Sequence, residues 1–268
     1  MCNRIRVLML VLGIACLAPG TATSQDMLNN TPDYIGAWNH AHIMRHRGDT
    51  ARARESQSDI AARNRSSVER QLRYSASPRV TARVHAAFAD YLGGGRGDRA
   101  HWPALLRAVA RDSPPGSPFA QALGRRFGAD HAAILATLQS GAAQAELRKG
   151  LAAAGRSDDR LLDVHASFLL LSWMVANGET AVRNPNAAFD GIQQQLVAQH
   201  VDDAGGDDAT LQEAAETMAL LDVMLNVAWF DATPAETRVL QSGVASLGRR
   251  LGMDYTRLGL TASGFRTL

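Results

Sequence analysis

The stretch from Leu161 to Ala176 reads LLDVHASFLLLSWMVA, and the stretch from Met218 to Phe230 reads MALLDVMLNVAWF. Each would be apolar on nearly every side of a helix, which is typical of helices buried in a bundle or in a membrane. Neither uninterrupted apolar run reaches the roughly 20 residues that a membrane-spanning helix needs. The two stretches therefore predict the central helices of a bundle, with shorter amphipathic helices packed around them.

Helix boundaries are marked along the chain from about residue 77 onward. A capping residue is followed by proline, which favours a helix start, at Ser77, Ser117, Asn184 and Thr233. The segments 210–213 and 233–236 have the spacing of a capping box. The predicted helices span residues 79–92, 103–111, 118–127, 130–139, 142–154, 158–177, 185–201, 210–230 and 234–251.

The fold class follows from these helices and from the residues between them. No convincing alternating pattern of a strand is present, and alanine, a strong helix former, is abundant. We predict an all-α protein, a multi-helix orthogonal bundle around two apolar central helices, with a loosely structured basic N-terminal arm. The expected divisions are a signal peptide over 1–24, an exposed Arg-rich arm over 25–76 and a helical domain over 77–268.

The first 24 residues have the three parts of a secretory signal peptide. Arg4 and Arg6 give a positive start, residues 7–18 are apolar, and small residues follow. Cleavage is expected before Gln25, and Ala22 ends an alternative site. The protein is therefore predicted to be exported, to the periplasm or out of the cell, with no transmembrane segment after cleavage.

The signal peptide also removes both cysteines of the chain. A lipid anchor at Cys16 is not favoured, because Gly13 stands where such motifs have a leucine-like residue. With Cys2 and Cys16 gone, the mature chain has no disulfide, thiol nucleophile or thiolate metal site. Loss of two arginines leaves 26 basic residues against 26 acidic ones, so its formal net charge is zero.

The predicted arm is polar and rich in arginine. Between residues 45 and 73, four acids accompany eight arginines, which are Arg45, Arg47, Arg52, Arg54, Arg63, Arg65, Arg70 and Arg73. This density favours binding to an anionic surface, modestly and in a salt-sensitive way. Nucleic acid is not a predicted partner, because no aromatic residue for base stacking lies between Trp38 and Tyr74.

Two short motifs resemble those of a known family. One is the segment 72–80, LRYSASPRV, and the other lies near the C-terminus, with GMD at 252–254 and LGLTASGF at 258–265. On these motifs the chain resembles an uncharacterised family of exported bacterial proteins, classed as a domain of unknown function. The resemblance covers roughly residues 70–268. It implies an exported helical domain behind a variable N-terminal arm, and it implies no activity and no site residues.

The weak catalytic candidates lie in the two central helices. Asp222 and Asn226 are four residues apart and share one helix face, where a buried carboxylate could act as an acid or base. His165 lies between Asp158 and Ser172, each seven residues away, which evokes a hydrolase triad. Two helical turns span about 10.5 Å, too far for direct contact along one helix. The structural alternative, a satisfied polar pair and a core histidine, remains open beside the catalytic one.

Three other patterns predict little chemistry. His40, His42 and His46 have metal-ligand types, but no acid or second cluster completes a site. The loop 202–213 has the length of an EF-hand and lacks its ligand pattern. The tripeptide Arg-Gly-Asp occurs at 47–49 and 96–98. No nucleotide, hydrolase or metalloprotease motif is found, so no metal and no cofactor is predicted.

These observations predict an exported all-α protein that binds another protein in the cell envelope or outside the cell, more likely a non-enzyme than an enzyme. A hydrolase using His165, Asp222 and Asn226 is the first alternative, and it requires these side chains to line one open cleft. A host-surface ligand acting through the two Arg-Gly-Asp tripeptides is a weaker alternative.

Overall fold

The structure is a computed structural model, and it describes residues 67–68, 72–95, 97–200 and 207–268. The signal peptide, Cys16, the three clustered histidines, the first Arg-Gly-Asp tripeptide and most of the predicted arm lie outside these residues.

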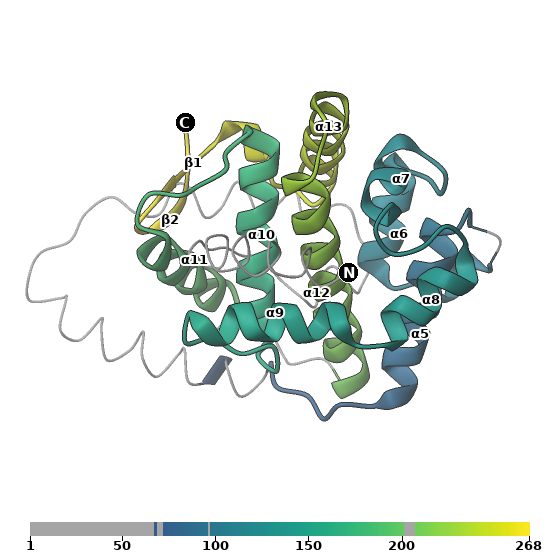
Figure 1. Ribbon diagram of the computed structural model, residues 1–268. Helices are drawn as coiled ribbons and strands as arrows, with labels where there is room; N and C mark the ends of the chain where they lie inside the picture. Colours follow the sequence, from purple (N-terminus) through teal and green to yellow (C-terminus); the bar gives the residue numbers. More distant parts are fainter. Residues whose placement is uncertain (1–66, 69–71, 96, 201–206) are drawn as a thin grey trace, which may run out of the picture.

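The described residues form a mostly α-helical protein, as the sequence predicts (Figure 1). The α-helices are α5 (Pro78–Leu92), α6 (Ala104–Asp112), α7 (Pro118–Gly124), α8 (His131–Gln139), α9 (Ala142–Ala153), α10 (Leu161–Asn177), α11 (Pro185–His200), α12 (Asp208–Phe230) and α13 (Pro234–Arg250). Two short 3-10 helices, η1 (Arg99–His101) and η2 (Tyr255–Arg257), interrupt the connections.

The helix starts show which capping predictions hold. Thr233 and Glu236 form a complete capping box at α13. The capping box predicted over residues 210–213 is wrong, because α12 begins at Asp208, two residues before the predicted start. Asp207 is its N-cap and accepts a hydrogen bond of 2.7 Å from the backbone N–H of Thr210. Ser77 precedes α5 in an extended conformation, but its side chain makes no capping bond.

A C-terminal hairpin is the feature that the sequence prediction missed. Strands β1 (Leu258–Thr261) and β2 (Gly264–Thr267) pair in antiparallel register, with Leu260 opposite Phe265. Strands of four residues are too short to give a clear alternating pattern. The hairpin lies against α11, where the Gln195 side chain accepts from the Phe265 N–H at 3.0 Å and donates to its carbonyl at 2.8 Å. A helix therefore supplies the hydrogen bonds that a third strand would supply.

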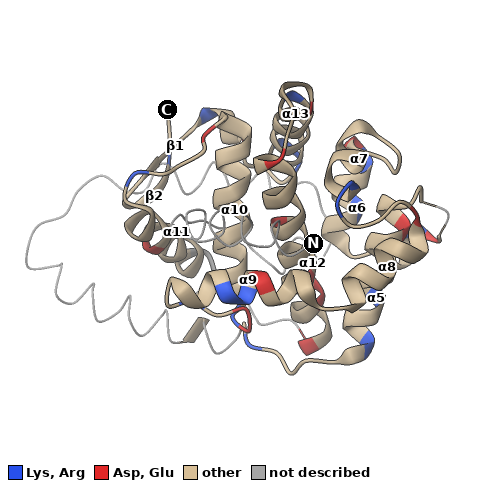
Figure 2. Cartoon of the chain, viewed as in Figure 1, with Lys and Arg blue, Asp and Glu red and all other residues tan. Residues whose placement is uncertain are grey.

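The core is built around α10 and α12, which pack along each other. Most of their apolar side chains join one large buried cluster with residues from α5, α6, α7, α8, α9, α11 and α13, while Leu170 and Met174 of α10 form a small separate one. In Figure 1, α9 runs across α10 and α12, in keeping with a bundle whose helices are not all aligned. Figure 2 shows that α10 is uncharged along nearly all of its length, because Asp163 is its one charged residue. The prediction of two apolar central helices is confirmed.

The packed domain begins before residue 77. Val68 and Leu72, within the segment predicted to be an exposed arm, are buried and belong to the main core cluster. Tyr74 is partly buried against the same cluster. The end of the predicted arm is therefore part of the domain, since its three large apolar side chains find partners that the sequence alone does not reveal. None of the described helices is both long enough and apolar enough to cross a membrane.

Candidate functional site

A groove of about 400 Å³ lies beside the first half of α5. We call this cavity the α5 groove. It is lined by seven residues, which are Ala76, Ser77, Pro78, Thr81, Ala82, His85 and Gln139. Thr81 and His85 are one turn apart on α5, so their side chains share a face, and Gln139 ends α8. The groove therefore combines two hydroxyls, an amide and an imidazole with small apolar side chains.

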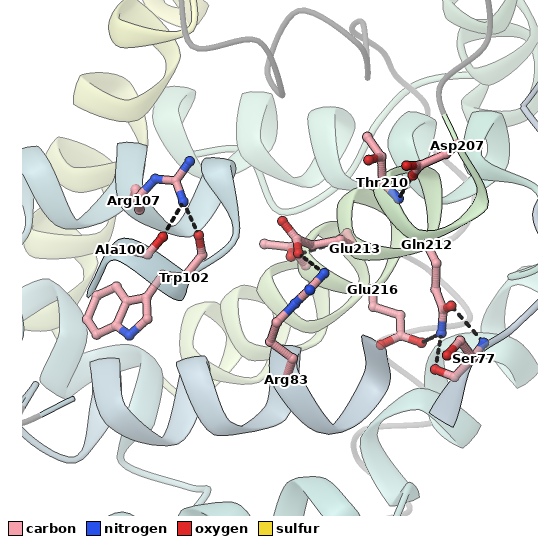
Figure 3. A network of polar contacts seen from close by, with 11 residues as sticks. Ser77, Arg83, Ala100, Trp102, Arg107, Asp207, Thr210, Gln212, Glu213 and Glu216 are labelled. Atoms are coloured by element: carbon pink, nitrogen blue, oxygen red, sulfur yellow. Dashed lines mark hydrogen bonds and ion pairs between the residues drawn. The ribbon is translucent and has the colours of Figure 1, made fainter. Parts of the chain in front are cut away.

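The first turn of α5 is held by Gln212 of α12. The Gln212 side chain accepts a hydrogen bond of 2.8 Å from the Ser77 N–H and donates one of 3.0 Å to the Ser77 carbonyl (Figure 3). Just before it, the Ser75 N–H donates to Asp208 at 2.9 Å. Gln212 is fully buried. Because a buried amide fixes both backbone groups of Ser77, the Ser77 hydroxyl is positioned in the groove without serving as a helix cap.

Behind the groove stands Glu216, one turn after Gln212 on α12. Its Oε1 accepts hydrogen bonds from the Thr81 hydroxyl at 2.7 Å and from the Gln212 amide at 2.8 Å. Its Oε2 is buried and has no hydrogen-bond partner among the described residues. On the outer side, Glu213 forms an ion pair with Arg83 (Figure 3). The Thr81 hydroxyl donates to this carboxylate and accepts a hydrogen bond of 3.1 Å from the Gln212 amide, so it is held by partners within the protein.

His85 lines the groove one turn after Thr81 on α5. It is 5% exposed, and its Nε2 lies 2.7 Å from Nε2 of Gln144 on α9. Burial lowers the pKa of His85, and the negative charge of Glu216 acts in the opposite direction. Burial and then Glu216 raise the pKa of Tyr74 to about 12. The hydrogen bond from the Thr81 hydroxyl places Glu216 beside the groove, which accounts for its effect on both groups.

A second pocket, of about 310 Å³, lies at the other end of α5. It is lined by Asp90, Gly93, Gly97 and His131, and the His131 Nε2 is 3.2 Å from Asp90 Oδ1. A Cβ atom at Gly97 would lie 1.7 Å from Asp90 Oδ2, so a larger residue there would displace the Asp90 carboxylate. The pair is an ion pair when His131 is protonated. Among the described residues, no group of three or more His, Cys, Asp or Glu side chains could hold a metal ion.

The predicted catalytic candidates are all buried. His165 is 1% exposed, Asp222 is 4% exposed and Asn226 is 3% exposed, and none of them lines either pocket. They therefore do not line a cleft open to solvent. Asp222 accepts a hydrogen bond of 2.5 Å from the Ser167 hydroxyl, and burial raises the pKa of Asp222 to about 7.

Helix geometry separates His165 from the carboxylate. Ser167 is two residues after His165, so the two side chains leave α10 about 200° apart around its axis. Because Asp222 bonds Ser167, it lies on the side of α10 that His165 does not face. The carboxylate of Asp158, the other supposed neighbour of His165, accepts a 2.9 Å hydrogen bond from Arg148. The structure thus does not bring a histidine and carboxylate of the central helices together at one accessible place.

Two other predicted motifs have structural roles in their described parts. Asp98 of the second Arg-Gly-Asp tripeptide accepts from the Ala100 N–H at 2.9 Å and lies 3.3 Å from His101. Of the acidic loop 202–213, residue 207 caps α12 and residue 208 begins it. Whether either motif binds a ligand stays a prediction.

The sequence analysis missed every residue of the α5 groove. One signal was present: Thr81 and His85, like Gln212 and Glu216, are polar pairs at a spacing of four residues in helices. Such pairs are common on solvent-exposed helix faces, so the pattern does not distinguish a surface from a junction between helices. Comparison of the chain with protein-family models, with curated proteins and with solved structures finds no match to any of them.

Proposed function

We propose that this protein is an exported binding protein that acts by binding another envelope or secreted protein, and that the α5 groove is its binding surface. Export is inferred from the charged, apolar and small-residue parts of residues 1–24. Membership of an exported bacterial family rests on the motifs at 72–80, 252–254 and 258–265 alone.

The observation that supports binding over catalysis is how the polar groups of the groove are used. The Thr81 hydroxyl is bonded to Glu216, and the His85 ring contacts Gln144. A hydroxyl nucleophile activated by histidine needs its hydroxyl bonded to the imidazole. Here the Thr81 hydroxyl donates to Glu216 and accepts from the Gln212 amide, while the His85 imidazole contacts Gln144. The Ser77 hydroxyl and the exposed Gln139 amide remain available to a ligand as hydrogen-bonding groups.

A small, shallow site fits a segment of a protein better than it fits a large rigid ligand. Ala76, Pro78 and Ala82 give the groove an apolar surface, and hydroxyl and amide groups stand at its edge. Binding sites with this combination use apolar contacts for affinity and a few polar groups for orientation. The Arg-rich segment 45–73 would add salt-sensitive attraction to an anionic surface.

Site-specific photocrosslinking in the cell tests this proposal. A photoreactive side chain at Ala82 or Gln139 should capture one defined envelope or secreted protein. The same group at Ala152, exposed on α9 and outside the groove, should not capture it. The purified partner should then bind the mature chain, and Ala82→Arg should weaken binding at least tenfold while Ala152→Arg leaves it unchanged. Absence of a groove-specific partner, or equal binding by Ala82→Arg, would contradict the proposal.

Export has its own measurement. The protein should be found in the periplasm or the medium, and its N-terminal sequence should begin at Gln25 or Thr23. Retention of an intact N-terminus inside the cell would contradict export without bearing on the groove.

A further inference from the structure

Two buried acceptor atoms near His85 have no hydrogen-bond partner among the described residues. One is Oε1 of Gln144, whose amide nitrogen contacts the His85 ring, and the other is Oε2 of Glu216. An unsatisfied buried acceptor costs about 1–3 kcal/mol, so two of them around one titratable ring call for an explanation. The ring is also part of the α5 groove, which connects this polar cluster to the proposed binding surface.

In the orientation that the structure gives it, the Gln144 amide favours a neutral His85 ring. The Gln144 Nε2 is an amide nitrogen, which donates hydrogen bonds and accepts none. His85 Nε2 must therefore be the acceptor in the 2.7 Å contact, so the ring is neutral and carries its proton on Nδ1. A proton added at Nε2 would point an N–H group at an NH₂ group. With the amide in this orientation, the contact suits neutral His85.

We propose that His85 is a proton-sensitive switch of the α5 groove. When Nε2 takes up a proton from solvent, the bond from Gln144 breaks and the Gln144 amide turns, so that its Oε1 accepts from the new N–H. The same proton gives the imidazole a positive charge, which the carboxylate of Glu216 stabilises. Oε1 of Gln144 and Oε2 of Glu216 have no hydrogen-bond partner among the described residues while His85 is neutral. Each is an acceptor for an N–H group of the protonated ring. The biological consequence, different partner binding at neutral and acidic pH, rests on the proposed function.

The charged surroundings set the direction of the switch. Among the described residues packed against His85, α12 supplies the carboxylate of Glu216, while α9 and α8 supply the neutral amides of Gln144 and Gln139. Burial lowers the pKa of His85 from the ordinary value of 6.5, and Glu216 limits that decrease. The groove should therefore stay in its neutral form near pH 7 and change only below pH 6.5. A periplasmic or secreted protein would experience such conditions when the medium acidifies.

The switch is tested by NMR on the mature chain without any partner. The His85 imidazole should titrate below pH 6.5, and the side-chain amide of Gln144 and the backbone amides of Thr81 and Ala82 should shift with the same midpoint. In Glu216→Gln, which keeps an acceptor for the Thr81 hydroxyl, the midpoint should move to lower pH. In His85→Gln the shared transition of the amides should disappear, whereas in His101→Gln, an exposed histidine outside the groove, it should remain.

Two results would overturn the switch. One is titration of His85 with no change at Gln144, and the other is persistence of the shared amide transition in His85→Gln. If His85→Gln does not fold, the midpoint in Glu216→Gln decides, because an unchanged or raised midpoint contradicts the proposal. These measurements need no partner, so the switch can fail while the binding function stands. The absence of a crosslinked partner would instead leave the titration result intact.

Discussion

The hydroxyl of Ser167 donates a 2.5 Å hydrogen bond to the carboxyl group of Asp222, and both side chains are buried between α10 and α12. None of the ion pairs between described residues involves Asp222, so the hydroxyl is the group that compensates its loss of water. Burial dominates and raises the pKa of Asp222 from 3.8 to about 7, with the Ser167 bond opposing the rise. This carboxyl group makes the stability of the central helix pair dependent on pH.

We predict that Asp222→Asn stabilises the protein at neutral and basic pH. A carboxyl group whose folded-state pKa is raised keeps its proton in the folded state between about pH 4 and 7, where the unfolded chain has lost it. The contribution of this group to the free energy of unfolding is therefore largest below about pH 4, and it is lost as the pH rises to about 7. The shift corresponds to at most about 4 kcal/mol at pH 8, which the asparagine removes. Urea unfolding of both proteins from pH 4 to 8 measures this. Equal pH dependence of the two would show that Asp222 is not buried as described.

Tyr91→Phe should destabilise the domain by about 1–2 kcal/mol. The Tyr91 hydroxyl donates a buried 3.0 Å hydrogen bond to the Ser113 carbonyl, and the ring packs edge-on against Trp102 at 6.0 Å between centroids. Phenylalanine keeps the ring contact and leaves the Ser113 carbonyl without its donor. Chemical denaturation checks the loss. A variant as stable as the parent would mean that water replaces the tyrosine hydroxyl.

Two of the helix starts that contain proline, those of α5 and α13, should respond differently to loss of the residue before proline. Thr233 accepts from the Glu236 N–H and completes a capping box, so Thr233→Ala should cost about 1 kcal/mol. The Ser77 side chain makes no capping bond, so Ser77→Ala should cost only a few tenths of a kcal/mol. Thermal unfolding of the two variants side by side makes the comparison. An equal loss in both would contradict the difference in capping.

Gly191→Ala should dislodge the C-terminal hairpin from α11. A Cβ atom at Gly191 would lie 2.3 Å from the backbone nitrogen of Gly264 and 2.4 Å from the Ser263 carbonyl carbon, and these backbone atoms cannot move aside cheaply. Overpacking of this kind costs about 1–3 kcal/mol. Limited proteolysis should cut the hairpin faster in this variant than in Gln194→Ala, an exposed substitution on the same helix. Unchanged proteolysis would mean that the hairpin is not seated on Gly191.

The helices were predictable because their signals are local. Proline after a capping residue, an all-apolar run such as 161–176 and the terminating glycine at residue 178 all act within a few residues of the chain. The hairpin was not predictable, because its strands are too short to hold together without α11. Burial of Val68 and Leu72 was not predictable for the same reason, because it depends on helices that are distant in the sequence.

The candidate site, too, was only partly predictable from the sequence. The sequence identified Asp222 and Asn226 as polar residues in an apolar helix, and the structure places both in the core. It offered no means of choosing Glu216 or His85 from among the polar residues on helix surfaces. Glu216 and Thr81 are 135 residues apart in the chain, and only the packing of α5 on α12 brings them to 2.7 Å.

The sequence by itself determined the all-α class, the two central helices and nearly every helix boundary, because periodicity, capping and proline act over one or two turns. Tertiary structure alone decided that Asp222 of α12 accepts from Ser167 of α10 and that His85 lines a groove. It also decided which acceptor atoms remain unsatisfied. These are properties of distances between helices, and such distances are set by how side chains fill the core and not by any one segment of the chain.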